Sequence, residues 1–357
     1  FSIRELLFSV AILGLVLAVL LPALGRTREA ARRSSCAYNL KNIGYSLSLY
    51  ATESPDQKLP PVQIHIEYPS MSNPYYEGEL NEFTYRFRYD FAPSIRAIYV
   101  GYSQDPKMLI CPSDYENDMR YMDELRCVGF NDSWNEDSRS FAQEGCIADR
   151  DDSYKYYGWV FDKGGDERRG DPVTRSTANM EASWLNPFVQ PQFNTEGDPD
   201  FTVPMQMNAT LTAMHHQAWG SSKAEFFKRF SDQIINKRTW EASDSDFNIG
   251  SETLIESDVW DPNKFYGNGS TNTVYRLRNG ITRFLFTDIN NSKEANFTRS
   301  TIWVMHEKIG LTPDGFFHTP GGTNVLYLDG HVEFVPLEER APAMKTNAYS
   351  GSQFSNL

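Results

Sequence analysis

Hydrophobic and polar positions divide the chain into a short apolar N-terminal stretch and a long polar remainder. The run from Leu6 to Gly25 contains twenty residues without a charge. At a rise of about 1.5 Å per residue, a helix of that length crosses a hydrocarbon core of about 30 Å. We therefore expect residues 1–25 to form a helix that can span a membrane.

The helical pattern continues beyond this apolar run. Between residues 26 and 50, apolar side chains recur at spacings compatible with one helix face: Ala30, Leu40, Ile43, Leu47 and Tyr50. We expect one helix of about 50 residues whose second half, 26–52, packs on a globular head. The helix should end near residues 51–55, because Pro60 and Pro61 follow and cannot continue it.

The remaining residues, 53–357, predict a mixed head with a large insertion at about 115–280. Expected elements are a short helix at 93–102, an amphipathic helix at 221–238, an irregular stretch at 162–215, and strands at 154–161, 281–287, 301–305, 323–327 and 331–335. An Asp-Gly turn at residues 328–330 joins the last two strands as a hairpin. The pattern indicates an α+β fold built on an antiparallel sheet.

Composition narrows the function classes. The net charge is −13 and the pI is about 5.0, whereas phosphate binding needs a basic surface, so nucleic acid is not an expected partner. An aromatic content of 14% indicates a packed domain and not a disordered one. No GxSxG elbow, P-loop or GxGxxG motif occurs, so we expect no enzyme activity.

The N-terminal residues resemble the mature N-terminus of the type IV pilin superfamily, which comprises type IV pilins and the pseudopilins of type II secretion. The resemblance rests on Phe1, on Glu5, and on Gly14 and Pro22 inside the apolar stretch. It departs at Arg4, where the family has an apolar residue. The resemblance implies cleavage of a basic leader by a prepilin peptidase, N-methylation of Phe1 and a type IV pilin fold. The plainer alternative is a membrane anchor or an uncleaved signal sequence.

The same resemblance implies how the protein assembles. An ionised carboxylate in an apolar environment is unfavourable unless it is paired, and the implied partner of Glu5 is the amino group of Phe1 in a neighbouring subunit. Arg4 is a second candidate partner. Gly14 and Pro22 weaken the helix and would let it lengthen in a filament core.

The function implied is that of a structural subunit of an extracellular filament, assembled from the inner membrane by a type IV pilus-like machine. Alternatives are a pseudopilin of type II secretion, for which a head of this size is large, and a minor or adhesive tip pilin. A third alternative is a membrane-anchored binding protein that never polymerises, but this function would give Glu5 no role.

A second set of motifs resembles large pilin-like proteins of planctomycetes and related bacteria, which carry an H-x9-DG signature. The matching residues are His318 and Asp329-Gly330, with ten intervening residues in place of nine. The family also has a Cys followed by Asn-Leu-Lys, here Cys36 with residues 39–41, and a Cys-Pro-Ser, here residues 111–113.

Cysteine number and charge distribution bear on the compartment. The four cysteines indicate two disulfides in an oxidising compartment, and among the three connectivities we favour Cys36–Cys111 with Cys127–Cys146. Arginines 26, 28, 32 and 33 follow the apolar run and only Arg4 precedes it, which by the positive-inside rule alone keeps the head cytoplasmic. A removed basic leader would restore the outward orientation.

Metal ligands are not recognisable from spacing. His215 and His216, His306 with Glu307, and His318 with Asp329 and His331 form no HExxH or calcium-loop pattern, so we expect no metal site. Calcium is a known pseudopilin ligand, and the acidic loops at 162–171, 244–246 and 258–261 offer carboxylates without defining a site. Five N-x-S/T triplets mark candidate glycosylation sites: Asn131, Asn208, Asn268, Asn290 and Asn296.

Overall fold

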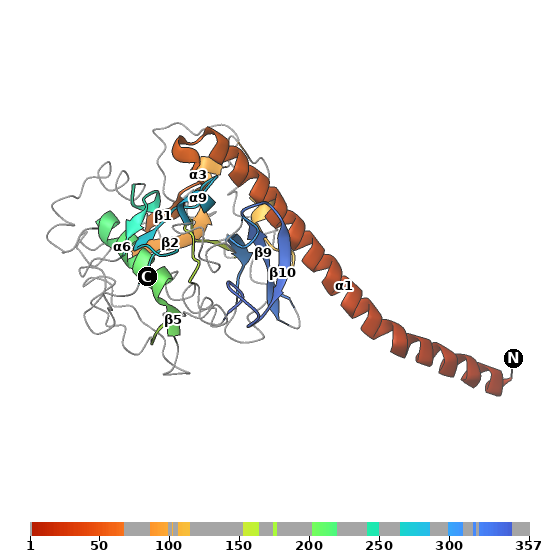
Figure 1. The fold of residues 1–357 in the computed structure, drawn as a ribbon. Coiled ribbons are helices and arrows are strands. Elements are labelled where there is room, and N and C mark those ends of the chain that lie inside the picture. Colours follow the sequence, from red (N-terminus) through yellow and green to blue (C-terminus); the bar gives the residue numbers. More distant parts are fainter. Residues whose placement is uncertain are drawn as a thin grey trace, which may run out of the picture.

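The computed structural model describes residues 2–67, 86–98, 102, 106–114, 153–163, 174–176, 202–219, 241–249, 265–285, 299–309, 317–318 and 321–344. One long helix projects from a head in which strands and short helices are mixed (Figure 1). The expected amphipathic helix at 221–238 and the cysteines at 127 and 146 lie outside the described residues.

The first helix, α1 (Ile3–Glu53), spans 51 residues and runs without a break through Gly14 and Pro22. Ser2 caps its N-terminus, and the Ser54 amide caps its C-terminus by donating to the Tyr50 carbonyl at 2.9 Å. This agrees with the expected length and end point. The N-terminal half leaves the head and bends on its way to the N-terminus (Figure 1).

The head contains a central antiparallel sheet in the order β10-β9-β8-β3. Its strands are β3 (Tyr154–Tyr156), β8 (Trp303–Glu307), β9 (Gly322–Tyr327) and β10 (Val332–Pro336). Every residue of β8 and β9 is buried, since α1 packs against β9 and an aromatic cluster fills the core. The expected hairpin is confirmed, and Gly330 at φ 90° provides the left-handed residue of its turn.

Smaller elements surround this sheet. Among the described residues, three two-stranded sheets pair β1 (Val62–Glu67) with β2 (Arg86–Pro93), β4 (Thr174–Ser176) with β5 (Thr202–Pro204), and β6 (Phe247–Asn248) with β7 (Thr273–Val274). The part of the chain that the structure describes also contains the short helices η1 (Pro55–Gln57), α3 (Ile95–Ile98), η2 (Pro106–Leu109) and α9 (Thr282–Leu285) and the longer α6 (Met205–Trp219). Together with α1, these elements make the described structure α+β.

The structure corrects four local expectations. Residues 282–285 form the helical turn α9 and not a strand, and α6 occupies the end of a stretch expected to be irregular. The strand expected at 154–161 ends at Tyr156, and residues 95–98 carry the helix expected across 93–102.

The head-packed face of α1 is narrower than the sequence pattern indicated. Its buried residues follow helical spacing at Cys36, Leu40, Ile43, Leu47 and Ala51, each no more than 1% exposed. Ala30 is exposed and Tyr50 is only half-buried. The docked part of the helix therefore begins at the half-buried Glu29, about two turns before Cys36.

Candidate functional site

The N-terminal half of α1 is an apolar rod on which no residue of the described part of the head packs. It is long and apolar enough to cross a membrane, and none of its most apolar stretch is buried inside the protein. Its large side chains are exposed, from Ile3 at 76% to Leu24 at 62%. Exposed apolar area on this scale is unfavourable in water, so the segment needs lipid or other apolar helices around it.

Glu5 and Arg4 lie at the tip of this rod. The Glu5 Oε2 atom accepts a hydrogen bond from the Ser2 backbone amide at 2.9 Å, and the Ser2 hydroxyl accepts one from the Arg4 amide at 3.4 Å. Together these bonds make a capping box, which sequence reasoning did not foresee. In a single subunit, therefore, the Glu5 carboxylate caps the N-terminus of its own helix.

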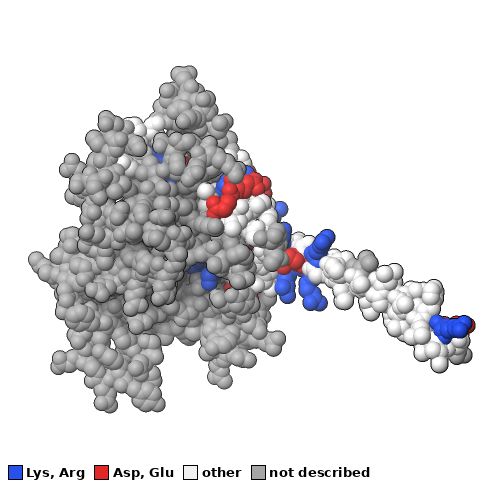
Figure 2. All heavy atoms as spheres, turned by 90° about the horizontal axis from the view of Figure 1, so that it is seen from below, with Lys and Arg blue, Asp and Glu red and all other residues white. Residues whose placement is uncertain are grey.

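Basic side chains gather round α1 where it leaves the head (Figure 2). Arg26, Arg28 and Arg32 are exposed there, and Arg33 is half-buried with its guanidinium 4.2 Å from the centre of the Phe334 ring. This collar separates the apolar rod from the acidic head.

A buried histidine joins α1 to the sheet just beyond the collar. His318 Nδ1 lies 2.8 Å from Glu29 Oε1 on α1, and Nε2 lies 3.1 Å from Glu307 Oε1 at the end of β8. Burial alone would lower the pKa of His318, but the hydrogen bonds and charges of Glu307 and Glu29 raise it above its usual value. A protonated imidazole donates to both carboxylates and so connects the two elements.

Asn324 of β9 fixes the Glu307 carboxylate. Its backbone amide donates to Glu307 Oε2 at 2.8 Å, and its side-chain Nδ2 donates to Oε1 at 2.9 Å. The same Nδ2 lies 3.3 Å from the Arg33 carbonyl on α1. Glu307 is 1% exposed, so these donors are needed to keep a carboxylate there.

The expected disulfide between Cys36 and Cys111 is present beside this histidine, with a Cα–Cα separation of 5.3 Å and both residues fully buried. The Ser113 amide donates to Cys111 Sγ at 3.5 Å, and this sulfur lies 3.9 Å from Glu307 Oε1. We call the six residues the junction cluster: Glu29, Cys36, Cys111, Glu307, His318 and Asn324. The ligand atoms of Cys36, Cys111, Glu307 and His318 all lie within 4.8 Å of one another.

Sequence reasoning grouped these residues differently. His318 was considered with Asp329 and His331, but those two form a separate pair on the hairpin, where His331 Nδ1 lies 2.5 Å from Asp329 Oδ1. Glu29 and Asn324 were missed altogether. The only available signal was that Glu29 lies one helical heptad before Cys36, on the same face of α1.

His306, next to Glu307 in sequence, faces a different environment. Its Nδ1 donates to the Glu307 carbonyl at 2.7 Å, and its ring lies 5.9 Å from Tyr157 and 5.7 Å from Trp303. Burial lowers the pKa of His306 to about 4. It is a neutral core residue at physiological pH.

The described acids of the loops considered for calcium already have partners. Asp162 accepts from Gln206, from Asn268 and from the Gly269 amide at 2.7–2.8 Å. Asp246 pairs with Arg278, and Asp244 lies 3.5 Å from Lys58 and 3.6 Å from Arg276. These carboxylates therefore hold the head together.

One candidate glycosylation site is corrected. Asn268 is 0% exposed, and its Nδ2 donates to the Val160 carbonyl and to Asp162 Oδ1, so the folded protein cannot present this nitrogen to an enzyme. Asn208 lies in α6, as do His215 and His216. Residues 131, 290 and 296 lie outside the described part of the chain.

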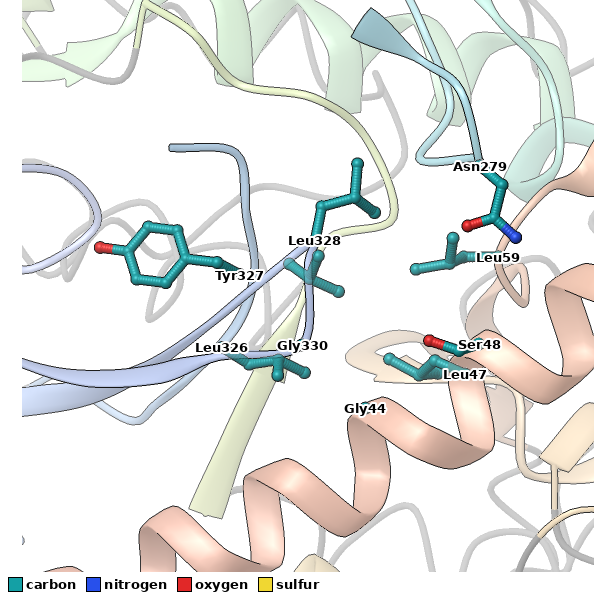
Figure 3. A pocket seen from close by; sticks show the side chains of 10 residues that line it. Gly44, Leu47, Ser48, Leu59, Asn279, Leu326, Tyr327, Leu328 and Gly330 are labelled. Atoms are coloured by element: carbon teal, nitrogen blue, oxygen red, sulfur yellow. The ribbon is translucent and has the colours of Figure 1, made fainter. Parts of the chain in front are cut away.

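A small hollow lies between α1 and the β9 hairpin (Figure 3). Its lining is mainly aliphatic, with Leu47 of α1 facing Leu326 and Leu328. Gly44 allows the close approach, since a Cβ atom there would lie 2.9 Å from Leu326 Cδ1. The hollow is a packing gap at the helix–sheet seam.

Comparison of the chain with protein-family models, curated proteins and solved structures finds no match. The apolar rod and the junction cluster are the features of the described structure that bear on function.

Proposed function

We propose that the protein is a pilin, a structural subunit of an extracellular type IV pilus-like filament that is assembled from the inner membrane. The observation that carries this proposal is the division of α1: one continuous helix is exposed and apolar in its first half and packed into the head in its second. Such a helix is suited to a membrane before assembly and to a bundle of identical helices afterwards.

Within this proposal, Glu5 changes partner on assembly. In the single subunit its carboxylate accepts from Ser2, and in the filament it would pair with the Phe1 amino group of a neighbouring subunit. An unpaired charge among packed apolar helices is costly, so a subunit in the wrong register would be rejected. Processing by a prepilin peptidase and N-methylation of Phe1 belong to the same proposal.

The head-packed half of α1 supports contact with a second copy of the chain. Its outward face exposes Tyr38 at 65%, Tyr45 at 60% and Leu49 at 54%, spaced at 7 and 4 residues. These side chains form a second exposed apolar surface on α1, beyond the arginine collar. A filament in which α1 helices pack side by side would cover both the apolar rod and these three side chains.

The pseudopilin and tip-pilin alternatives share this helix and differ in where the subunit resides. A bulky head disfavours a piston confined to a secretion channel, and it suits a surface filament. Electron microscopy of sheared surface material, combined with mass spectrometry, distinguishes them. Long filaments made mainly of this chain support a major pilin, traces of it at filament ends indicate a tip pilin, and retention in the membrane contradicts a surface filament.

Two substitutions of Glu5 separate its charge from its role in the cap. Glu5→Gln keeps an oxygen acceptor for the Ser2 amide and removes the charge, whereas Glu5→Ala removes both. We expect both variants to lose filaments while the protein remains in the membrane, with Glu333→Ala, on the exposed edge of the head, as the control. Normal filaments from Glu5→Gln would show that assembly does not depend on the charge pair.

A further inference from the structure

We propose that Cys36, Cys111, Glu307 and His318 bind one Zn²⁺ ion when the two cysteines are thiols. The four ligand atoms come from α1, from the loop after η2, from β8 and from the segment before β9, and they already lie within 4.8 Å of one another. All four residues are buried. Two sulfurs, one imidazole nitrogen and one carboxylate oxygen form a donor set typical of tetrahedral zinc.

Distances favour this geometry. In a tetrahedral site, with zinc bonds of about 2.0–2.3 Å, ligand atoms lie roughly 3.3–3.8 Å apart. His318 Nε2 and Glu307 Oε1 are 3.1 Å apart, and Cys111 Sγ is 3.9 Å from the same oxygen. Opening the disulfide lets the two sulfurs separate by the small distance that the ion requires.

The surrounding groups are those that zinc ligands need. Glu29 Oε1 lies 2.8 Å from His318 Nδ1, which fixes the proton on Nδ1 and leaves Nε2 free as a ligand. Asn324 donates its amide to the second oxygen of Glu307, and Ser113 donates its amide to Cys111 Sγ. A carboxylate behind the histidine and an N–H group on the sulfur both orient ligands toward a metal.

The two cysteines either bind zinc as thiolates or form the disulfide, and the two states exclude each other. Zinc binding releases protons from both thiols and from Nε2 of His318, and no electrons move. Disulfide formation transfers two electrons and two protons from the thiols to a disulfide oxidant, which leaves as a dithiol. In each state Cys36 is tied to the head, so α1 stays docked before and after oxidation.

The test uses the full chain in detergent micelles, with Cys127→Ser and Cys146→Ser to remove the other thiols. Zinc binding is measured by competition with a chromophoric chelator, and Co²⁺ absorption reports the coordination geometry. We expect one tight Zn²⁺ per chain after reduction, tetrahedral Co²⁺ spectra and no binding to the oxidised protein. Because the oxidised protein is the same folded chain, it is a control for non-specific binding.

Variants assign the ligands. His318→Gln and Glu307→Gln should abolish tight binding, Glu29→Gln should weaken it by about 10–100-fold at unchanged stoichiometry, and His331→Gln should have no effect. Circular dichroism verifies that each variant is folded in its disulfide form. Absence of binding to the reduced protein, or undiminished binding by His318→Gln and Glu307→Gln together, would overturn the site.

Discussion

Replacing His318 tests whether the junction cluster holds α1 on the head. The imidazole makes two charged hydrogen bonds, one to the buried Glu307 and one to Glu29, whose side chain is 20% exposed. A charged hydrogen bond contributes about 1.5–3 kcal/mol. Solvent reduces the Glu29 contribution, and Asn324 keeps Glu307 hydrogen-bonded, so we expect His318→Gln to lower the unfolding free energy by about 2–3 kcal/mol.

The loss should depend on pH with a defined sign. The folded-state pKa of His318 is raised, so its stabilisation is fully present below the unfolded pKa of about 6.5 and disappears as the pH rises through the folded pKa. The difference between wild type and His318→Gln should therefore be greatest below about pH 6.5 and should fall as the pH rises above the folded-state pKa of His318.

Denaturant unfolding of the full chain in detergent, followed by tyrosine and tryptophan fluorescence, measures this difference. The control is His331→Gln, since His331 is an exposed histidine paired with Asp329 on the hairpin. A loss for His318→Gln that grows as the pH rises above about 6.5, or one that is no greater than the loss of the control, would refute the reasoning.

Substitutions at three further positions test other parts of the fold by the same unfolding assay. Lowering the pH from 6.5 to 4 should reduce the unfolding free energy of the wild type by about 3 kcal/mol, because the pKa of buried His306 is lowered to about 4. His306→Gln should remove this pH dependence. An unchanged pH dependence in the variant would contradict the prediction. Gly44→Val should destabilise by about 1–3 kcal/mol because its side chain overlaps Leu326, whereas Gly44→Ala should be nearly neutral, since a gain in helix propensity of about 1 kcal/mol offsets a smaller overlap. Asn268→Ala should cost about 2–4 kcal/mol by leaving buried partners unpaired, and mass spectrometry should find no glycan on Asn268 in the wild type.

Elements governed by local chemistry could be predicted from the sequence. The length of α1 follows from uninterrupted apolar spacing and a stop before two prolines, and the hairpin follows from Asp329-Gly330. By contrast, α6 was missed, although Met207, Thr210 and Met214, each at most 1% exposed, follow helical spacing. The polar Thr210 interrupts the apolar pattern on that buried face, so no continuous apolar stripe marks the helix in the sequence. The run at 281–287 alternates like a strand, but Ile281 and Leu285 are also four residues apart and are buried by a helical turn.

The junction cluster could not be predicted for a different reason. Its side chains come from α1, β8, β9 and two loops, and Glu29 and His318 are separated by 289 positions. Local periodicity carries no information about such pairs. A glutamate and an arginine four residues apart on α1 indicate an ordinary surface ion pair, and Glu29 and Arg33 do form one at 3.7 Å. Only the docking of α1 on the sheet shows that Glu29 also forms a hydrogen bond with the buried His318.

The position of the junction cluster fits the mechanical role that the proposed function requires. A tensile load on a filament would reach each head through the apolar half of α1, and it would first meet the head where the helix begins to pack. Glu29 and Cys36 lie at that point, whereas Leu40, Ile43 and Leu47 lie further along the seam. An apolar seam loaded from one end separates one contact at a time, and each contact contributes only a small part of the total. A covalent or metal bond at Cys36 prevents the first contact from separating alone. The contacts along the seam must then break at the same time. We therefore expect the junction cluster at the start of the helix–sheet seam and not at its centre.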